Sequence, residues 1–336
     1  MTLVVCPNLA IDRMLAADIV RPGSMTRCRA LRTQAGGKGA NIVRAQRALG
    51  GDGPGAAGGG AAGGGTRPLL AGFAAGRGGR LIAELAHEEG LELDLVVTGG
   101  EARVSTVVLG DDGSVTRLYE LGPEIGPEDE RALIALVPGH PAAPGEWAVV
   151  TGAAPPGVSP GFYSALVRAA RAAGYRVLVD ATDEQLTGAL SERPDLVKVN
   201  LAEACSAVGR PDAHCEDEKR ASATDLVAVG LELCRRLVGA GAAGAVVTLG
   251  AEGAAALLGG GEWHVSTPPI RVVSPVGSGD CFAAGLTLAL SGGEPAEAAL
   301  RLAAGAAAAN ATSPYNGDVD PALAHGLAVG AVAALH

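Results

Sequence analysis

The stretch Pro275-Val276-Gly277-Ser278-Gly279-Asp280 places consecutive Gly-Ser-Gly amides and one carboxylate at the start of a predicted helix over Ser278–Leu290. Backbone N–H groups at a helix N-terminus form a preorganised pocket for negative charge that develops during a reaction. Asp280 lies in the first turn, beside this pocket. An acid there also suits the helix dipole, which is the structural alternative. An anion pocket beside a carboxylate is, however, what phosphoryl transfer to a hydroxyl requires.

A second glycine cluster, Gly36-Gly37-Lys38-Gly39-Ala40-Asn41, precedes a predicted helix over Ala40–Leu49. Glycines allow a ligand to approach the backbone closely, and the helix start offers unpaired N–H groups. Lys38 adds a positive charge and Asn41 a donor and an acceptor. A tight turn before an ordinary helix is the structural alternative. The chain has only three lysines among its 26 basic residues, which favours a binding role for Lys38.

The charge distribution narrows the class of ligand. The whole chain has 26 basic and 36 acidic residues, a balance that disfavours nucleic acid and anionic membranes as partners. Between Arg13 and Arg47, however, eight basic residues face a single acidic one, Asp18. A solvated basic face explains part of this excess. The remainder indicates an anionic small molecule such as a phosphate ester, and the lack of aromatic residues in this segment argues against stacked bases.

Other features exclude several classes of protein. Met1 leads straight into the apolar run Leu3–Val5 without a basic n-region, and no apolar stretch reaches the roughly 18 residues of a membrane span. We therefore expect a cytoplasmic protein. The six cysteines contain no CxxC pair, so we expect no zinc site and no disulfide framework. Glycine patterns at 58–63 and 239–244 lack the strand–turn–helix context of a dinucleotide fingerprint, and no Walker A motif is present.

Short apolar runs alternate with Ala-rich helical patterns over most of the 336 residues, which predicts an α/β fold with a mostly parallel, doubly wound sheet. The expected strands are Leu3–Cys6, Leu69–Phe73, Trp147–Thr151, Arg176–Asp180, Leu196–Val199 and Ala245–Leu249. The expected helices, besides the two above, are Gly79–Glu89, Pro160–Ala173, Leu201–Val208, Thr224–Val238, Pro295–Ala309 and Pro321–Ala334.

Two segments interrupt this alternation. Arg103–Leu109 and Val115–Leu121 are predicted to form a hairpin. Together with residues of about 14–34, this hairpin (103–121) could form a small β-layer, for example a lid over a ligand cleft. The segment 51–65 is almost pure Gly and Ala, which is typical of a flexible surface loop.

Taken together, three motifs resemble those of the ribokinase-like carbohydrate kinases of the phosphofructokinase B type. They are GGKGAN at 36–41, TLGAEG at 248–253 and VGSGD at 276–280. The opening Cys6–Asp12 resembles the NPAID start of the branch that contains 1-phosphofructokinase and tagatose-6-phosphate kinase. The likeness covers essentially the whole chain outside the Gly/Ala segment. It implies one kinase domain over residues 1–336, built as a three-layer αβα sandwich with a β-lid.

The resemblance also implies an activity, the magnesium-dependent transfer of the ATP γ-phosphate to a hydroxyl of a sugar phosphate. By analogy, Asp280 is the catalytic base and the amides of Gly277, Ser278 and Gly279 form the anion hole. On the substrate side, Asp12 would hold sugar hydroxyls and Arg103 would grip the existing phosphate. The sugar pocket would further be lined by Gly36, Gly37, Lys38 and Asn41.

For the nucleotide, the resemblance implies a loop formed by Thr248, Gly250, Glu252 and Gly253, with Lys198 and Asn200 close to the phosphates. Asn200 and Glu203 would organise Mg²⁺ through water, and Asp180, at the end of a strand, would join the same shell. Magnesium prefers such oxygen ligands and keeps several waters. The structural alternative for Asn200 and Glu203 is a capping box at a helix start.

Three positions depart from the family pattern: Ser105 replaces a lid asparagine, Ala153 replaces a serine and Val199 replaces a proline. The first two lie on the sugar side, so the identity of the sugar phosphate is not determined by the sequence. Fructose 1-phosphate is the best expectation, with tagatose 6-phosphate or fructose 6-phosphate as alternatives. A sugar-phosphate sensor without turnover is the alternative of a different class. The sequence does not determine the oligomeric state: a monomer and a homodimer formed through the lid both remain possible.

Overall fold

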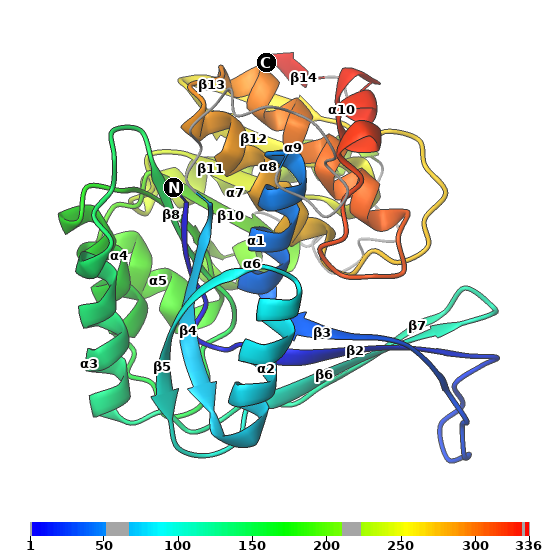
Figure 1. Cartoon of the computed structure of the whole chain (residues 1–336). Coiled ribbons are helices and arrows are strands. Elements are labelled where there is room, and N and C mark those ends of the chain that lie inside the picture. Colours follow the sequence, from blue (N-terminus) through cyan, green and yellow to red (C-terminus); the bar gives the residue numbers. More distant parts are fainter. Residues whose placement is uncertain (1, 52–66, 210–222, 331–332, 336) are drawn as a thin grey trace.

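The computed structural model describes residues 2–51, 67–209, 223–330 and 333–335. Within them, a ten-stranded sheet forms the centre of the molecule (Figure 1). Its strands, from one edge to the other, are β14 (Ala333–Leu335), β13 (Gly261–Val265), β12 (Ala254–Leu258), β11 (Ala245–Thr248), β10 (Leu196–Asn200), β9 (Arg176–Asp180), β8 (Trp147–Thr151), β1 (Leu3–Val5), β4 (Leu69–Ala75) and β5 (Glu92–Thr98). Pairing is parallel from β11 to β5 and antiparallel from β11 to β14.

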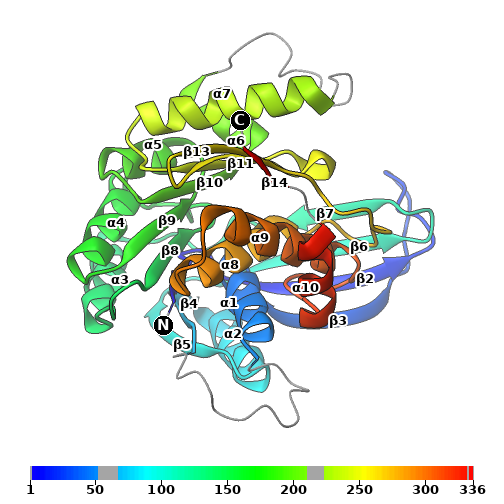
Figure 2. The same ribbon diagram turned by 90° about the horizontal axis from the view of Figure 1, so that it is seen from above.

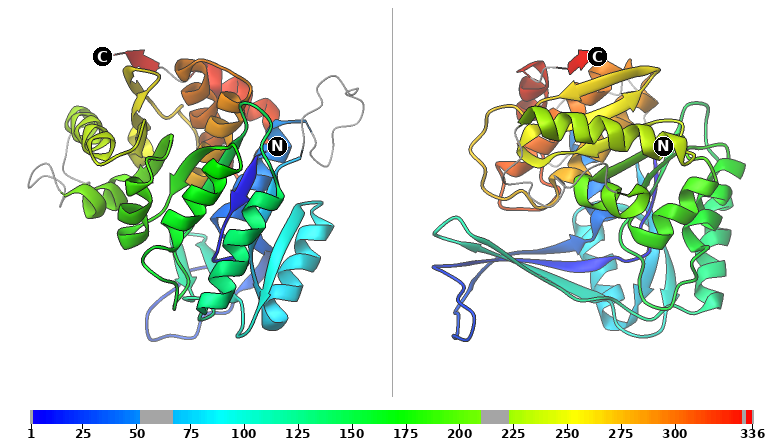
Figure 3. Two further views of the ribbon diagram at one scale, coloured as in Figure 1. Left: turned by 90° about the vertical axis from the view of Figure 1, so that its left-hand side faces the viewer. Right: turned by 180° about the vertical axis from the view of Figure 1, so that it is seen from behind.

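Helices cover both faces of this sheet, as Figure 2 and Figure 3 show. Side chains of one sheet face pack against α1 (Lys38–Leu49), α2 (Gly76–Glu88), α8 (Ser278–Ser291), α9 (Ala296–Ala311) and α10 (Pro321–Gly330). The opposite face packs against α3 (Pro127–Leu136), α4 (Phe162–Ala172), α5 (Asp183–Ser191), α6 (Leu201–Val208) and α7 (Ala223–Gly239). Short 3₁₀ turns lie at Val137–Gly139 and Gly250–Glu252. The predicted αβα sandwich is confirmed.

A second sheet of four strands extends from this body (Figure 1). Its order is β3 (Arg29–Gly36), β2 (Ala10–Ala17), β6 (Arg103–Gly110) and β7 (Val115–Tyr119). The parallel pairing of β2 with β6 joins two segments that are distant in the chain. β2 begins at Ala10 rather than near residue 14, so Asp12 is itself a lid-sheet residue. We call this sheet the lid. The expected flexible loop 51–65 lies, apart from Gly51, outside the described residues.

The six strands expected in the main sheet are present within two residues of their predicted ends. Several elements were not predicted. β12 consists of Ala and Leu, which carry little strand signal, and β5 is an edge strand that is only partly buried and carries charged residues. α3 begins with Pro127 and an acidic first turn, a start signal that sequence reasoning overlooked.

The predicted helix Pro321–Ala334 is wrong in its last part. α10 ends at Gly330, and Ala333–Leu335 pairs with β13 as the edge strand β14. Glycine is a weak helix former, and the open edge of β13 offers backbone hydrogen bonds that an alanine pattern cannot reveal. Among the helices of the described segments, none has the length and apolar character needed to cross a bilayer.

The stacking of two aromatic rings supports the packing of α4 on the sheet. Phe162 is 1% exposed, and its ring centroid lies 6.1 Å from that of Phe73 on β4. Aromatic residues make up only 3% of the chain, so few other side chains fill as much volume. We expect Phe162→Ala to lower the free energy of unfolding by about 3–5 kcal/mol because it leaves a cavity. Urea denaturation followed by circular dichroism measures this loss.

Val329→Ala is the matched control, because this side chain is 83% exposed on α10. Its effect should stay within about 0.5 kcal/mol. Equal losses for the two variants would contradict a core role for Phe162.

Candidate active site

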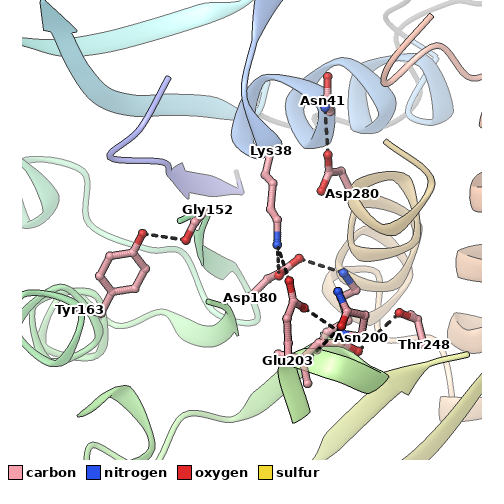
Figure 4. A network of polar contacts seen from close by, with 11 residues as sticks. Lys38, Asn41, Gly152, Tyr163, Asp180, Asn200, Glu203, Thr248 and Asp280 are labelled. Carbon is pink, nitrogen blue, oxygen red and sulfur yellow. Dashed lines mark hydrogen bonds and ion pairs between the residues drawn. The ribbon is translucent and has the colours of Figure 1, made fainter. Parts of the chain in front are cut away.

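The carboxyl ends of three neighbouring parallel strands supply polar side chains at one edge of the main sheet. Asp180 is the last residue of β9, Asn200 of β10 and Thr248 of β11. In doubly wound sheets, ligands bind at this edge because loops and helix N-termini converge there. α1 and α8 both begin over it, each directly after one of the two glycine-rich turns (Figure 4).

A cavity of about 870 Å³ lies between this edge and the lid. Most of the predicted site residues line it: Asp12, Gly37, Lys38, Asn41, Arg103, Lys198, Asn200, Glu203, Thr248, Gly250, Glu252, Gly277, Gly279 and Asp280. Four others do not: Gly36, Asp180, Gly253 and Ser278. The two glycine-rich turns therefore share one cavity.

The lid contributes polar side chains to the cavity, because alternate residues of its strands share one face. Arg103 and Ser105 lie two residues apart on β6, as do Arg117 and Tyr119 on β7, so each pair shares a face. Asp12 on β2 is opposite Ser105, which in turn is opposite Tyr119. The lid thus presents two guanidinium groups and one carboxylate at one end of the cavity.

Asp280 and Asn41 connect the two turns directly. Asn41 Nδ2 donates to Asp280 Oδ2 at 2.8 Å (Figure 4). Asp280 is only 7% exposed. Burial raises the pKa of the Asp280 carboxyl to about 6, against the opposing effects of Lys38, Lys198 and the Asn41 hydrogen bond. A carboxyl group with a raised pKa that faces a cavity can take up a proton near neutral pH.

Asp180 lies behind the cavity wall and holds two lysines. Its Oδ1 accepts from Lys38 Nζ at 2.7 Å, and its Oδ2 accepts from Lys198 Nζ at 2.9 Å. Burial by itself would raise the pKa of Asp180, but the two ammonium groups outweigh this effect and lower the pKa to about 2. Asp180, Glu203 and Asp280 likewise outweigh burial at Lys38 and raise the pKa of its ammonium group. Both members of the Lys38–Asp180 pair are therefore charged at neutral pH.

The expected role of Asp180 in a magnesium shell stays a prediction: each of its oxygens pairs with a lysine, and its side chain does not line the cavity. Asn200 and Glu203 form a capping box: Asn200 Oδ1 accepts from the Glu203 N–H, and Glu203 Oε2 accepts from the Asn200 N–H, both at 2.8 Å. Glu203 Oε1 lies 3.5 Å from Lys38 Nζ, too far for a strong hydrogen bond. This oxygen therefore retains the capacity to hold a water molecule of a hydrated Mg²⁺.

Few direct metal ligands are available elsewhere. Within the described ranges, no group of three or more His, Cys, Asp or Glu side chains could hold a metal ion. The residues present therefore fit a hydrated Mg²⁺ that takes most of its ligands from water and phosphates, and they do not fit a metal cage made by the protein alone.

The start of α8 leaves two backbone donors open. Gly277 has a left-handed φ of 84°, and the N–H groups of Gly277 and Gly279 have no acceptor among the described residues. The Ser278 N–H donates to Pro275 O at 3.2 Å, and Ser278 Oγ accepts from Asn310 Nδ2 at 3.1 Å. Of the three amides expected to form an anion hole, the two glycine amides remain available.

Neither Gly36 nor Gly253 lines the cavity, but each needs to be glycine for a different reason. A Cβ at Gly36 would lie 2.2 Å from Asp12 Oδ1, so a side chain there would displace the Asp12 carboxylate. Gly253 has a φ of +91°, and a Cβ there would lie 1.9 Å from Val265 O. Gly36 therefore makes room for a cavity residue, and Gly253 allows the turn after Thr248.

Sequence reasoning missed three polar cavity residues: Arg117, Tyr119 and Asn316. The alternation of the predicted hairpin was a signal for Arg117, because it faces the same side as Arg103. Asn316 gave no such signal. It lies in a loop after α9, is 3% exposed, and donates from Nδ2 to Asp12 Oδ2 at 3.1 Å. Ser105 lines the cavity, whereas Ala153 does not.

Comparisons with known proteins agree with this architecture. Residues 1–322 match the family model described as pfkB family carbohydrate kinase. The chain is 31% identical over 304 residues to a 1-phosphofructokinase from Rhodobacter capsulatus, which covers 89% of this chain and 88% of that protein.

Two solved structures share the fold. Phosphofructokinase-2 from Escherichia coli in complex with substrates and products superposes with a TM-score of 0.81 at 24% identity, over 98% of each chain. Ribokinase from Arabidopsis thaliana complexed with ribose and ATP superposes with a TM-score of 0.68 at 21% identity, over 97% of this chain and 98% of that one. The α/β body, the lid, the shared cavity and the family match lead to one conclusion: the chain belongs to the pfkB family of carbohydrate kinases.

Proposed function

We propose that this kinase transfers the γ-phosphate of ATP to a hydroxyl group of fructose 1-phosphate and forms fructose 1,6-bisphosphate. One observation carries the proposal: the Asp280 carboxylate and the open amides of α8 lie in the same cavity as two lid arginines. A phosphorylated sugar needs cations at one end and a proton acceptor at the other. The 1-phosphofructokinase from Rhodobacter capsulatus supports the choice of substrate.

The lid is proposed to bind the sugar phosphate. Arg103 donates from Nε and Nη2 to Asn8 O at 3.2 and 3.0 Å, which holds its guanidinium in one orientation. Arg117 faces the same end of the cavity, and together the two arginines would bind the existing phosphate. Asp12 would accept hydrogen bonds from sugar hydroxyls, since its neighbours Gly36 and Asn316 hold its carboxylate in place.

The nucleotide is proposed to bind over the carboxyl ends of β10 and β11, where Thr248, Gly250 and Glu252 line the cavity. Lys38 and Lys198 carry positive charge between the two ends and would face the phosphates. Mg²⁺, when bound, would neutralise phosphate charge, and Glu203 and Asn200 would hold it through water.

In the proposed reaction, Asp280 accepts the proton of the attacking sugar hydroxyl. The hydroxyl oxygen forms a bond to the γ-phosphorus, the bond from that phosphorus to the β-γ bridging oxygen breaks, and ADP leaves. The N–H groups of Gly277 and Gly279 face the transferring phosphoryl group and stabilise its charge. Asn41 keeps the Asp280 carboxylate oriented throughout, because it donates to one of its two oxygens.

The substrate is tested by ADP release in the presence of ATP, Mg²⁺ and a panel of sugar phosphates. We expect the highest kcat/KM with fructose 1-phosphate. A higher value with tagatose 6-phosphate or fructose 6-phosphate would replace the proposed substrate, in line with the altered lid residue Ser105. Tight binding of a sugar phosphate without any ADP release would identify a sensor.

Asp280→Asn tests the proposed base. The substitution keeps the size of the side chain and removes its ability to accept a proton, so we expect kcat to fall by about 10²–10⁴-fold while ligand binding is retained. In the wild type, Asp280 must be ionised to act. With a pKa of about 6, kcat should decline as the pH falls through 6, and this acid limb should be absent in the variant. An unchanged rate would remove Asp280 from this role.

Arg103→Ala and Arg117→Ala test phosphate binding by the lid. Each should raise KM for the phosphorylated substrate far more than for its dephosphorylated analogue, because only the former loses a charge-assisted contact. Arg13→Ala is a matched control, since Arg13 lies on lid strand β2 but does not line the cavity. Equal losses with both substrates would show that the arginines do not bind phosphate.

A further inference from the structure

Arg44 lies on α1 one turn after Asn41, outside the cavity lining, and each of its three guanidinium nitrogens has an acceptor. Nε and Nη2 contact Glu89 Oε2 at 2.8 and 2.6 Å, and Nη2 also donates to Ala35 O at 2.7 Å. Nη1 donates to Asn41 Oδ1 at 3.1 Å and to Asn316 O at 3.0 Å. Four of these contacts are hydrogen bonds and the fifth, between Nη2 and Glu89 Oε2, is an ion pair, so all three guanidinium nitrogens are engaged.

The contact with Asn41 determines which end of that amide faces the cavity. A side-chain amide presents an acceptor at one end and two donors at the other. Because Arg44 occupies Oδ1, the Nδ2 end points toward Asp280 Oδ2 at 2.8 Å. A reversed amide would place an acceptor against the carboxylate and a donor against the guanidinium, and both arrangements are unfavourable.

The contact of Arg44 with Asn316 affects the carboxylate of Asp12. Asn316 O accepts from both Arg44 Nη1 and Gln34 Nε2, the latter at 2.8 Å, so the backbone of this loop is anchored between α1 and β3. From this anchored position Asn316 Nδ2 donates to Asp12 Oδ2 at 3.1 Å. Arg44 and Asp12 are thus connected through a single residue.

The neighbouring Gly317 permits this anchoring. Its φ is +73°, and a Cβ there would lie 2.8 Å from Asn41 Cα and 2.9 Å from Arg44 Nη1. Any larger residue would push the loop away from α1. The close approach of the two segments therefore depends on a glycine at this position.

We propose that Arg44 is a positioning residue that orients Asp280 and Asp12 together, through Asn41 and Asn316, without touching the substrate. This inference rests on the proposed function only for its kinetic test. Arginine is required because lysine has three donors and cannot form the paired contact with Glu89 while also reaching the two asparagines.

The kinetic test compares Arg44→Lys with Arg47→Lys. Arg47 is also on α1 and donates to the backbone oxygen of Glu89, but it contacts neither asparagine. In Arg44→Lys we expect kcat to fall by about 10²-fold, since small displacements of catalytic groups have costs of that order. KM for the sugar phosphate should rise and KM for ATP should stay unchanged. Arg47→Lys should leave all three constants unchanged.

These outcomes separate positioning from a general loss of stability. A merely structural role would lower kcat through a smaller active fraction and would leave both KM values unchanged. Full activity of Arg44→Lys would also overturn the proposal, because it would show that a positive charge at this position is sufficient. If Arg44→Lys does not fold, Glu89→Gln provides a second test. It removes the counterion of Arg44 and leaves one acceptor oxygen for both the Arg44 guanidinium and the Ala35 N–H, while the contact of Arg47 with the Glu89 backbone remains.

A second readout does not need turnover. In protein labelled with ¹³C at aspartate carboxyl groups, the Asp280 signal reports its titration among the charged groups that act on it, Lys38, Asp180 and Lys198. Loss of the Asn41 hydrogen bond disfavours the ionised form, so the Asp280 pKa should rise in Arg44→Lys and remain unchanged in Arg47→Lys. An unchanged titration in both variants would overturn the inference. If the wild type phosphorylates no sugar phosphate, the proposed function fails, and this titration still tests Arg44.

Discussion

The burial of the Asp180 carboxylate is the constraint on which the layout of the site depends. A buried charge without partners is strongly destabilising, whereas a buried charge with hydrogen-bonded counterions is tolerated. Asp180 has two such partners, which arrive from different parts of the chain, Lys38 from the start of α1 and Lys198 from β10. The first glycine-rich turn must therefore lie directly over the carboxyl ends of β9 and β10. The charged state of Lys38 follows from the same arrangement.

Because α1 is held over the sheet edge, its polar side chains can contact both α8 and the loop that contains Asn316. Asn41 reaches Asp280 on α8, and Arg44, paired with Glu89 directly after α2, reaches the loop that contains Asn316. That loop contacts Asp12 on the lid. The Asp280 and Asp12 carboxylates, which both line the cavity, are thus connected to α1 by hydrogen bonds. Groups fixed in this way need no rearrangement when charge develops, which is the basis of electrostatic catalysis in enzymes.

The division of the cavity follows from the two sheets. The main sheet contributes strand ends, whose exposed backbone and polar side chains suit a nucleotide, while the lid contributes one face of alternating side chains. Arg103, Ser105, Arg117 and Tyr119 occupy this face by strand periodicity. Substitutions among them therefore change the lining of the cavity and leave the sheet pairing intact. The replacement at Ser105 therefore alters the lid end of the cavity, whereas Asp280 and the amides of α8 lie on a different element.

The local sequence was sufficient for the three-layer architecture, for six strands of the main sheet and for the two glycine-rich turns, because apolar periodicity and helix-start signals are properties of neighbouring residues. It was also sufficient to single out Lys38, Asn41 and Asp280. It missed β12 and β14, whose alanines pair only because adjacent strands offer open edges. The tertiary structure alone decided that Asp180 binds two lysines, that Gly36 makes room for Asp12, and that Arg44 and Asn316 connect the two carboxylates. Such contacts join residues that are far apart in the chain, and their geometry depends on how sheet, lid and helices pack, so no local pattern encodes them.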